Sequence, residues 1–383
     1  MKYHREAIRV VFLFVRIALI DAALIGRAIP RCIMSTVIDN IQYLRSVAIQ
    51  NSLFTPTTLR GAIERLGFVQ ADPIRSPATA QDLILRHRVK GYRIGDLERK
   101  YATLDLEEDY LYAYGFLPSE NWRLLHPRKI LNLSGLENNV LAVIREFGAM
   151  HPRDLEKHCG AERVINAWGG YSKATTHALD HLQHRGLLRV IRREKGIRVY
   201  DAISPTEHSL STEERGIKLV NLVANIFAPT PLKNIQSLRF SKPESCSTRE
   251  TLSHLIATKE LRAVEVDGVQ YVLPAQISNA KEPPSVVRFL APFDPLVWDR
   301  NRFELFWNWS YRFEAYTPIA KRVRGYYALP LLWRDDIIGW ANVSVVNGSM
   351  NVELGFVGKR PRDALFKSEL EKETERMKYF LRL

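Results

Sequence analysis

Gln70 and Asp72 are the two side chains whose types and spacing could do chemistry together. Residues two apart in an extended strand point to the same side, so the pair places an amide and a carboxylate in one small region. A carboxylate can accept a proton or face a developing positive charge. The alternative is structural, because an Asp directly before Pro73 is typical of a helix N-cap followed by proline at the first helical position.

A second group of candidate residues is basic and lies in the run 187–202. Two β-like segments joined by a turn at 194–196 predict a hairpin there. Basic side chains on such a two-stranded ribbon suit phosphate contact or groove insertion. They are Arg189, Arg192, Arg193, Lys195 and Arg198. The alternative is a solvated hairpin whose charges keep an edge soluble.

Two smaller sets of residues are further candidates for contact with nucleic acid. Lys173 and Thr176 belong to a helix expected just before this hairpin, and short polar or basic side chains of that kind reach phosphates and base edges. Lys321 and Arg322 form a short basic cluster with Arg324, which we expect either to touch the phosphate backbone or simply to be exposed.

Neither a metal nor a cofactor is expected. The acidic run 105–109 could hold a metal ion, but a solvated helix start is the preferred interpretation. Cys32, Cys159 and Cys246 lie far apart without paired spacing, which indicates neither a disulfide framework nor a zinc cluster. This cysteine usage fits a reducing, cytoplasmic setting.

The spacing of apolar residues predicts the elements that carry these groups. Residues 43–129 are mostly helical, with a short β-like run at 67–73 that follows a glycine C-cap. Residues 137–203 show three short helical patterns and then a hairpin, which is the order of a winged helix. The same order recurs at 211–275, where Asp267-Gly268 is a strong hairpin turn. Residues 286–357 read as β-rich, and a charged helix at about 361–381 closes the chain.

The sequence therefore predicts an α+β fold with tandem winged-helix domains and a C-terminal β-rich domain. The expected parts are an N-terminal extension at 1–42, a helical winged-helix-like domain with the Gln-x-Asp motif at 43–136, a winged helix with a basic wing at 137–205, a second winged helix at 206–280 and the β-rich domain with its terminal helix at 285–383.

Composition and charge narrow the function classes. The chain has 383 residues, 46% apolar and 25% charged, which excludes a disordered, collagenous or low-complexity protein. Lys and Arg total 55 against 42 Asp and Glu, a net charge of +13. Such a balance favours a polyanionic partner, with nucleic acid first and an acidic membrane surface second.

The most apolar stretch is 10–26, but Arg16 and Asp21 interrupt it. It falls short of the roughly 18 uncharged residues expected of a membrane-spanning helix. A secretory signal is disfavoured by the same charges and by the lack of a clean small-residue cleavage site. The remaining interpretations are an amphipathic helix packed on the body of the protein and translation that begins at Met34. No membrane association is expected.

Gln70-Ala71-Asp72, the two winged-helix patterns and the stretch 290–300 (LAPFDPLVWDR) together resemble the YcaQ/AlkZ-type DNA glycosylases, which are bacterial winged-helix repair proteins. Members of this family carry a Gln-apolar-Gln or Gln-apolar-Asp motif near the N-terminus. The stretches 311–322 (YRFEAYTPIAKR) and 325–330 (GYYALP) look like the C-terminal signature of the family. The resemblance covers roughly residues 43–345.

The resemblance implies hydrolysis of the N-glycosidic bond of N7-alkylated guanine, as monoadducts or interstrand crosslinks, in double-stranded DNA. It implies catalytic roles for Asp72 and Gln70, a monomeric enzyme and no cofactor. Tyr110 and Tyr112 depart from the pattern, since a Trp-x-His pair is expected there, and any role of that histidine is lost or taken by a tyrosine. The rival interpretation is a non-enzymatic winged-helix regulator in which Asp72 is only a cap.

Overall fold

The structure is a computed structural model that describes residues 40–128, 132–165, 170–203, 209–277 and 280–383. Residues 1–39, which hold nearly all of the expected N-terminal extension, lie outside the described residues. Contacts divide the chain into two compact units. The described residues of the smaller unit lie within Leu125–Ser209, and the larger unit is Met34–Leu124 together with Leu210–Leu383.

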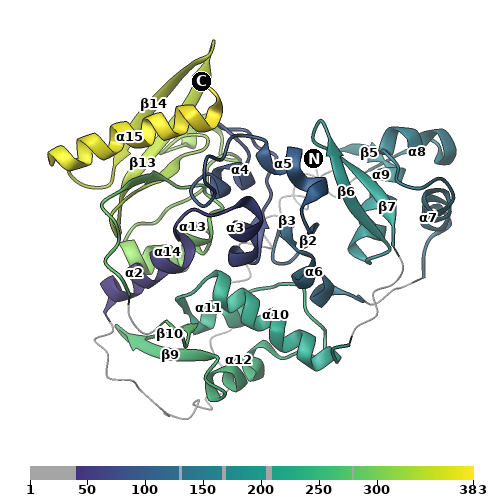
Figure 1. The fold of residues 1–383 in the computed structure, drawn as a ribbon, viewed down its shortest axis with the longest axis horizontal. Helices are drawn as coiled ribbons and strands as arrows, with labels where there is room; N and C mark the ends of the chain where they lie inside the picture. The colour runs from purple at the N-terminus through teal and green to yellow at the C-terminus, as the bar shows by residue number, and fades with distance from the viewer. Residues whose placement is uncertain (1–39, 129–131, 166–169, 204–208, 278–279) are drawn as a thin grey trace. The chain divides into compact units, whose positions relative to one another are not determined.

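The first part of the larger unit contains short helices and a small sheet, and its first helix, α2 (Ile41–Ser52), lies against α13 (Pro295–Trp298) and α14 (Arg300–Trp307) (Figure 1). Its helices are α2 (Ile41–Ser52), α3 (Leu59–Leu66), α4 (Ala80–Leu85), α5 (Asp96–Lys100), the 3-10 helix η1 (Tyr101–Thr103) and α6 (Ser119–Leu125), and its strands are β1 (Val69–Gln70), β2 (Leu106–Tyr110) and β3 (Tyr114–Pro118). Gly67 ends α3 with a φ of 71°, in the left-handed region that glycine adopts without strain. The predicted glycine cap and the β-like run after it are confirmed.

The acidic run is a strand and not the solvated helix start that the sequence predicted. It forms β2, which pairs antiparallel with β3 in a sheet of order β1-β3-β2. Glu108 accepts a hydrogen bond from the Tyr114 hydroxyl at 2.8 Å, and Asp109 accepts one from Trp122 Nε1 at 3.1 Å. The prediction was wrong because these partners, supplied by neighbouring elements, let the carboxylates be buried.

The second part of the larger unit follows the element order predicted for the second winged helix. It contains α10 (Thr212–Ile226), β8 (Thr230–Pro231), α11 (Leu232–Ser237), α12 (Thr248–Ala257), β9 (Leu261–Val266) and β10 (Val269–Pro274). The strands form a sheet of order β8-β10-β9. Asp267 and Gly268 turn between the last two strands with φ values of 50° and 74°, which is the geometry that this dipeptide favours.

The last part of the larger unit is built on a four-stranded antiparallel sheet of order β11-β12-β13-β14. Its elements are β11 (Val287–Phe289), α13 (Pro295–Trp298), α14 (Arg300–Trp307), η2 (Ile319–Lys321), β12 (Leu329–Trp333), β13 (Asp336–Val346), β14 (Ser349–Phe356) and α15 (Ala364–Leu381). Figure 1 shows α15, in yellow, lying against this sheet, where Phe366 contacts Trp333 and Phe356. The predicted β-rich region and closing helix are confirmed, whereas α13 and α14 were not predicted.

One buried ion pair joins distant segments of the larger unit. Arg88 Nη1 and Nη2 lie 2.8 Å and 2.9 Å from the two carboxylate oxygens of Asp294, and both residues are fully buried. Arg88 also donates to the Ser52 carbonyl, and Asp294 caps α13 through the Leu296 N–H. Asp294 lies in the stretch 290–300 that carries the family resemblance, so one of its signature residues is structural.

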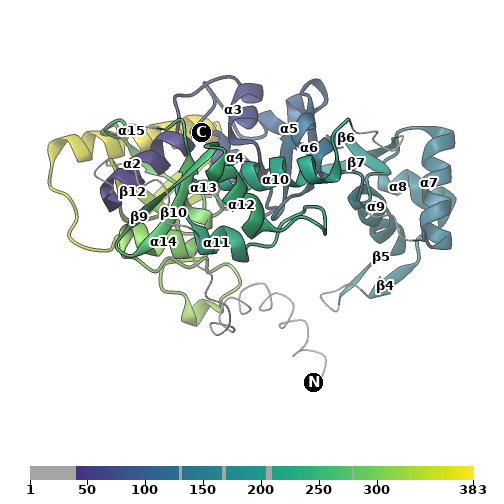
Figure 2. The same ribbon diagram turned by 90° about the horizontal axis from the view of Figure 1, so that it is seen from below.

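The smaller unit has the three helices and the hairpin predicted for a winged helix. Its elements are α7 (Gly135–Phe147), α8 (Pro152–Cys159), β4 (Arg163–Ile165), β5 (Tyr171–Lys173), α9 (Ala174–His184), β6 (Leu188–Glu194) and β7 (Ile197–Ala202). Figure 2 shows β4 and β5 extending as a narrow hairpin away from α7 and α8. This hairpin was not predicted, and Lys173 ends β5 and flanks α9 instead of lying within the helix.

The fold class is α+β, as predicted, and the order of helices and hairpins is consistent with tandem winged helices. The finer division into domains at 43–136, 137–205, 206–280 and 285–383 stays a prediction. Among the described residues, no helix combines the length and the apolar character needed to cross a membrane.

Candidate active site

Gln70 lies at the end of β1, opposite Gly115 of β3. A Cβ atom on Gly115 would stand 2.4 Å from the Val69 carbonyl oxygen and 2.5 Å from the Phe68 ring, so only glycine permits this close pairing. Gln70 Oε1 is buried and has no hydrogen-bond partner within the part of the chain that the structure describes. A buried amide oxygen without a partner is costly, and such a group is a candidate for contact with a ligand or a water.

Asp72 follows the strand and does not cap a helix. The nearest helix, α4, begins at Ala80 after Thr79. Asp72 Oδ1 instead accepts a hydrogen bond at 2.9 Å from the N–H of Ile74, and the Asp72 N–H donates to Gln81 Oε1 at 3.2 Å. The structure therefore contradicts the cap interpretation and shows a carboxylate held by a local turn.

The environment of Asp72 disfavours its charged form. Partial burial raises the pKa of the carboxyl above its usual value, and the hydrogen bond from the Ile74 N–H offsets this shift only in part. A carboxyl that is desolvated and carries no neutralising partner is typical of a functional site.

Tyr327 of the C-terminal part interacts electrostatically with this carboxylate. Tyr327 is 3% exposed, and its hydroxyl has no hydrogen-bond partner among the described residues. Burial raises the pKa of this hydroxyl, and the Asp72 charge raises it further. Phe313 packs edge-on to the Tyr327 and Tyr316 rings, with centroids 5.2 Å and 6.0 Å away. The structure thus brings Tyr327, from a distant segment, within electrostatic range of Asp72.

Sequence reasoning missed Tyr327 as a site residue, because aromatic residues in a β-rich stretch most often fill a core. The signal that would have found it is its hydroxyl, which needs a partner wherever the ring is buried. Arg300 makes two contacts with other residues of the C-terminal part. It donates to the Pro292 carbonyl at 2.9 Å and lies over the Tyr311 ring, 4.6 Å from its centroid.

The predicted basic contacts of the C-terminal part lie on the loop that follows Phe313. Lys321 is exposed at the end of η2. Arg322 is half-buried, donates to the Thr317 carbonyl at 2.8 Å and lies over the Tyr326 ring, 5.0 Å from its centroid. Both side chains therefore belong to the same loop as Tyr316.

The predicted basic wing of the smaller unit is the hairpin β6–β7, and several of its charges are already paired. Arg192 pairs with Glu194 at 2.8 Å, and Arg198 pairs with Asp180 at 2.8 Å. Lys195 is exposed at the turn with a φ of 51°.

The remaining residues of the smaller unit that were predicted to contact DNA also differ in whether they already have a partner. Lys173 lies 2.6 Å from a carboxylate oxygen of Glu156. Arg193 donates to the Gly196 carbonyl at 2.9 Å, within the wing itself. Arg189 on β6 and Thr176 on α9 are half-buried. DNA contact by these residues stays a prediction.

The two tyrosines at the position of the expected Trp-x-His pair have different surroundings. Tyr112 packs against Phe68, Phe227 and Trp298, with ring centroids 4.8, 4.9 and 4.8 Å away. Tyr110 is 52% exposed and packs edge-on against Tyr114. Tyr112 is therefore a packing residue, and it joins the turn between β2 and β3 to the C-terminal end of α10 and to α13.

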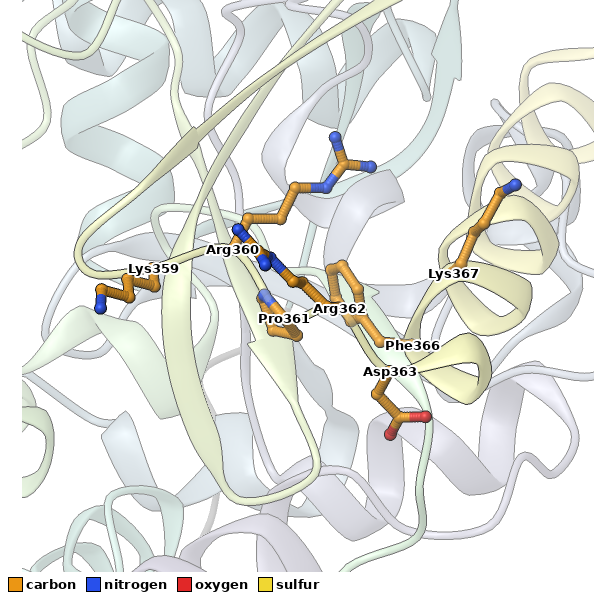
Figure 3. Close-up of a pocket in the computed structure, with 7 residues that line it drawn as sticks. All are labelled: Lys359, Arg360, Pro361, Arg362, Asp363, Phe366 and Lys367. Atoms are coloured by element: carbon orange, nitrogen blue, oxygen red, sulfur yellow. The ribbon is translucent and has the colours of Figure 1, made fainter.

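A basic surface hollow of about 870 Å³ lies where β14 leads into α15, and seven residues line it, including Lys359, Arg360 and Lys367. Figure 3 shows these three side chains fanning out in different directions, so they do not converge on one ligand. In the described ranges, no three His, Cys, Asp or Glu side chains gather in a way that could hold a metal ion.

The fold and the site together define a class, that of α+β proteins with winged-helix element order and one sheltered carboxylate. The family model of the AlkZ-like DNA glycosylases matches residues 63–380, and the chain belongs to this family. Among solved structures, the fold is similar to that of Streptomyces sahachiroi DNA glycosylase AlkZ, with a TM-score of 0.62 and 12% identity over 89% of this chain and 96% of that chain.

Membership confirms the resemblance that the sequence indicated. The protein is a DNA repair glycosylase, an enzyme that hydrolyses the bond between a base and its sugar in DNA. Membership in this family supports the glycosylase interpretation over that of a non-enzymatic regulator.

Proposed function

We propose that this glycosylase releases N7-alkylated guanine from double-stranded DNA, as monoadducts and as interstrand crosslinks, with Asp72 as the catalytic carboxylate. The observation that carries the proposal is the surroundings of Asp72. The carboxyl is half-buried with a raised pKa, and its charge acts on Tyr327. Two buried polar atoms, Tyr327 Oη and Oε1 of the nearby Gln70, have no hydrogen-bond partner among the described residues.

A single carboxylate suits this leaving group. Ordinary glycoside hydrolysis uses two carboxyl groups, one of which protonates the leaving oxygen. An N7-alkylated guanine already carries a positive charge, so it departs as a neutral base without an acid. The enzyme then needs only to stabilise a sugar with oxocarbenium character and to position a water.

Asp72 and Gln70 can divide these two tasks. Asp72 Oδ1 is held by the Ile74 N–H at 2.9 Å, which fixes the carboxylate so that it faces the developing cation and accepts the proton of the water. Gln70 Oε1 accepts a hydrogen bond from the same water and orients it. Proton transfer and water attack at the anomeric carbon leave an abasic site and a free base, with no covalent enzyme intermediate, so the enzyme is monofunctional.

The wing residues and the pair Lys321 and Arg322 contribute phosphate contacts in this proposal. We further propose that the protein acts as a monomer in the cytoplasm on one damaged nucleotide at a time.

The test is incubation with duplex DNA that contains N7-methylguanine, followed by detection of the free base. The wild-type protein should release the base and leave strands that break only after alkali or heat. A duplex crosslinked through N7 of guanine tests the crosslink activity separately. Release of no alkylated base, or strand cleavage without alkali, contradicts the proposal.

Asp72→Asn should slow base release by about 10²–10³-fold, because the variant keeps the shape of the side chain and loses its charge. Asp267→Asn is a matched control, since Asp267 is exposed at a hairpin turn with a φ of 50°, which asparagine also adopts. The control should retain the wild-type rate. Equal loss of activity in both variants would indicate a general effect of the lost charge.

A further inference from the structure

The loop between Phe313 and Tyr326 is closed by one buried carboxylate. Glu314 is 7% exposed, and its Oε2 accepts hydrogen bonds from the N–H groups of Val323, Arg324 and Gly325 at 3.0, 2.8 and 3.1 Å. The Glu314 carbonyl also accepts from the N–H of Thr317 at 2.9 Å. Both ends of the loop are therefore fixed at one point.

The closed loop is braced against the sheet. Asn342 of β13 donates from Nδ2 to the Arg324 carbonyl at 2.7 Å. Gly325 has a φ of +123°, and a Cβ atom there would stand 2.5 Å from Asn342 Oδ1, so the position requires glycine. Because so many contacts hold its base, the far part of the loop keeps its shape without a core of its own.

That far part presents apolar side chains to solvent. Tyr316, Ile319 and Val323 are 80%, 79% and 76% exposed. Single exposed hydrophobic residues are ordinary, but three on one braced loop of a few residues form a feature that the fold itself does not need. Lys321 and Arg322 lie between Ile319 and Val323, so the apolar side chains are accompanied by positive charge.

We infer that this loop is a wedge that enters the damaged DNA duplex, with Ile319 inserted between bases beside the lesion and Lys321 on the phosphate backbone. Proteins that kink DNA insert Ile, Leu, Phe, Met or Pro in this way, and Pro318 precedes Ile319 here. The inference rests on the proposed function. Phe313, at the base of the loop, packs edge-on against both Tyr316 of the loop and Tyr327 of the candidate site, and this contact places the loop beside that site.

Insertion of the loop would help the reaction by separating the bases around the lesion. Chemistry on a base within a duplex requires that stacking around it be broken, which costs energy that inserted apolar side chains offset. A protein partner or a membrane would also accept exposed apolar residues. Duplex DNA is the occupant that we propose, because the loop combines apolar residues with cations and is joined through Phe313 to the candidate site of a DNA glycosylase.

The experiment uses the full chain and a duplex with 2-aminopurine next to an N7-methylguanine. The wild-type protein should raise the 2-aminopurine fluorescence as the neighbouring bases unstack. Ile319→Ala should lose most of this rise and slow base release on the order of tenfold, while its affinity for undamaged duplex stays within about twofold of the wild type. The substituted side chain is exposed, so folding is not at risk.

Two matched variants control the result. Leu305→Ala removes another exposed apolar side chain, on α14 and 39% exposed, and should behave as the wild type. Ile319→Met keeps an apolar wedge and should retain the fluorescence rise. Ile319→Ala with wild-type fluorescence and wild-type release overturns the inference, and so does a loss of binding to anionic vesicles in that variant without any change on DNA.

The Asp72→Asn variant separates this inference from the proposed function. It should keep the fluorescence rise and lose base release, since unstacking does not depend on the carboxylate. If Asp72→Asn releases base at the wild-type rate, the proposed role of Asp72 fails while the fluorescence of Ile319→Ala still decides whether the loop unstacks DNA.

Discussion

At the scale of single residues, the candidate site contains polar groups whose burial costs folding free energy. Asp72 has a raised pKa because burial disfavours its charge, and Gln70 Oε1 and Tyr327 Oη are buried without partners in the described structure. None of these features stabilises the protein. Groups that cost stability and cluster around one carboxylate are expected where a protein is organised around a substrate.

The raised pKa of Asp72 predicts the pH dependence of base release. The carboxylate is the active form, so activity should fall as the pH drops through the pKa of Asp72. Because that pKa lies above the usual value for an aspartate, the fall should come at a higher pH than for an ordinary aspartate. The measurement is kcat/KM against pH on N7-methylguanine DNA, and an acidic limb at or below the usual value would contradict it.

The raised pKa of Asp72 also predicts how this carboxyl changes the stability of the folded protein with pH. A carboxyl whose pKa is raised on folding binds its proton more tightly in the folded state, so its contribution to stability is lost as the pH rises through the folded pKa. Asp72→Asn should therefore be at least as stable as the wild type at pH 7, although it is inactive. A large loss of stability in that variant would instead favour a structural role for Asp72.

Tyr327→Phe separates function from packing in a similar way. The variant removes a buried hydroxyl that has no partner in the described structure and keeps the ring that packs on Phe313. Its melting temperature should match or exceed that of the wild type, because an unsatisfied polar group is lost. Base release should slow by about tenfold if the hydroxyl contacts the water or the sugar. Unchanged release would show that Tyr327 only fills space.

At the scale of elements, buried polar pairs decide how distant segments meet. The Arg88–Asp294 pair ties the segment after α4 to the cap of α13, and the closure at Glu314 fixes the loop after Phe313. Both carboxylates lie in stretches that carry the resemblance to the family. Residues in the stretches that resemble the family therefore hold segments of this chain in place, in addition to the reactive groups that the Gln70–Asp72 motif supplies.

Asp294→Ala should destabilise the protein by about 3–5 kcal/mol, because it leaves the buried Arg88 without its carboxylate. Denaturant unfolding measures this loss. Arg88→Met combined with Asp294→Ala should cost less than the sum of the two single changes, since the uncompensated charge is gone. Simple additivity would mean that the two side chains do not depend on each other.

At the scale of the whole molecule, a net charge of +13 matches a DNA substrate. The structure shows, however, that some of the basic side chains already pair with acidic ones. In the smaller unit Arg192, Arg198 and Lys173 each pair with an acidic neighbour. An exposed pair can exchange its acidic partner for a phosphate at little cost, because such pairs contribute little in water.

Replacing Arg192 and Arg193 together by alanine should weaken binding to damaged and undamaged duplex alike and flatten the dependence of affinity on salt. Each lost phosphate contact lowers the slope of log affinity against log salt by about one. Fluorescence anisotropy at several salt concentrations measures both effects. Affinities that match the wild type at low and high salt would instead favour the interpretation of the wing as a solvated hairpin edge.

The sequence by itself determined the local features of this protein and its family. The Asp267-Gly268 turn and the glycine end of α3 depend on residues a few positions apart, so spacing and propensity suffice to predict them. The Gln70 and Asp72 motif and the C-terminal signature likewise identified the DNA glycosylases from the chain alone.

Only the tertiary structure decided what those local features do. The acidic run became a buried strand because Tyr114 and Trp122 supply hydrogen bonds to it. Asp72 became a half-buried carboxylate whose charge acts on Tyr327, a residue far along the chain. Burial and pairing depend on partners from distant segments, whose positions are fixed by the packing of the whole unit and not by the spacing of neighbours.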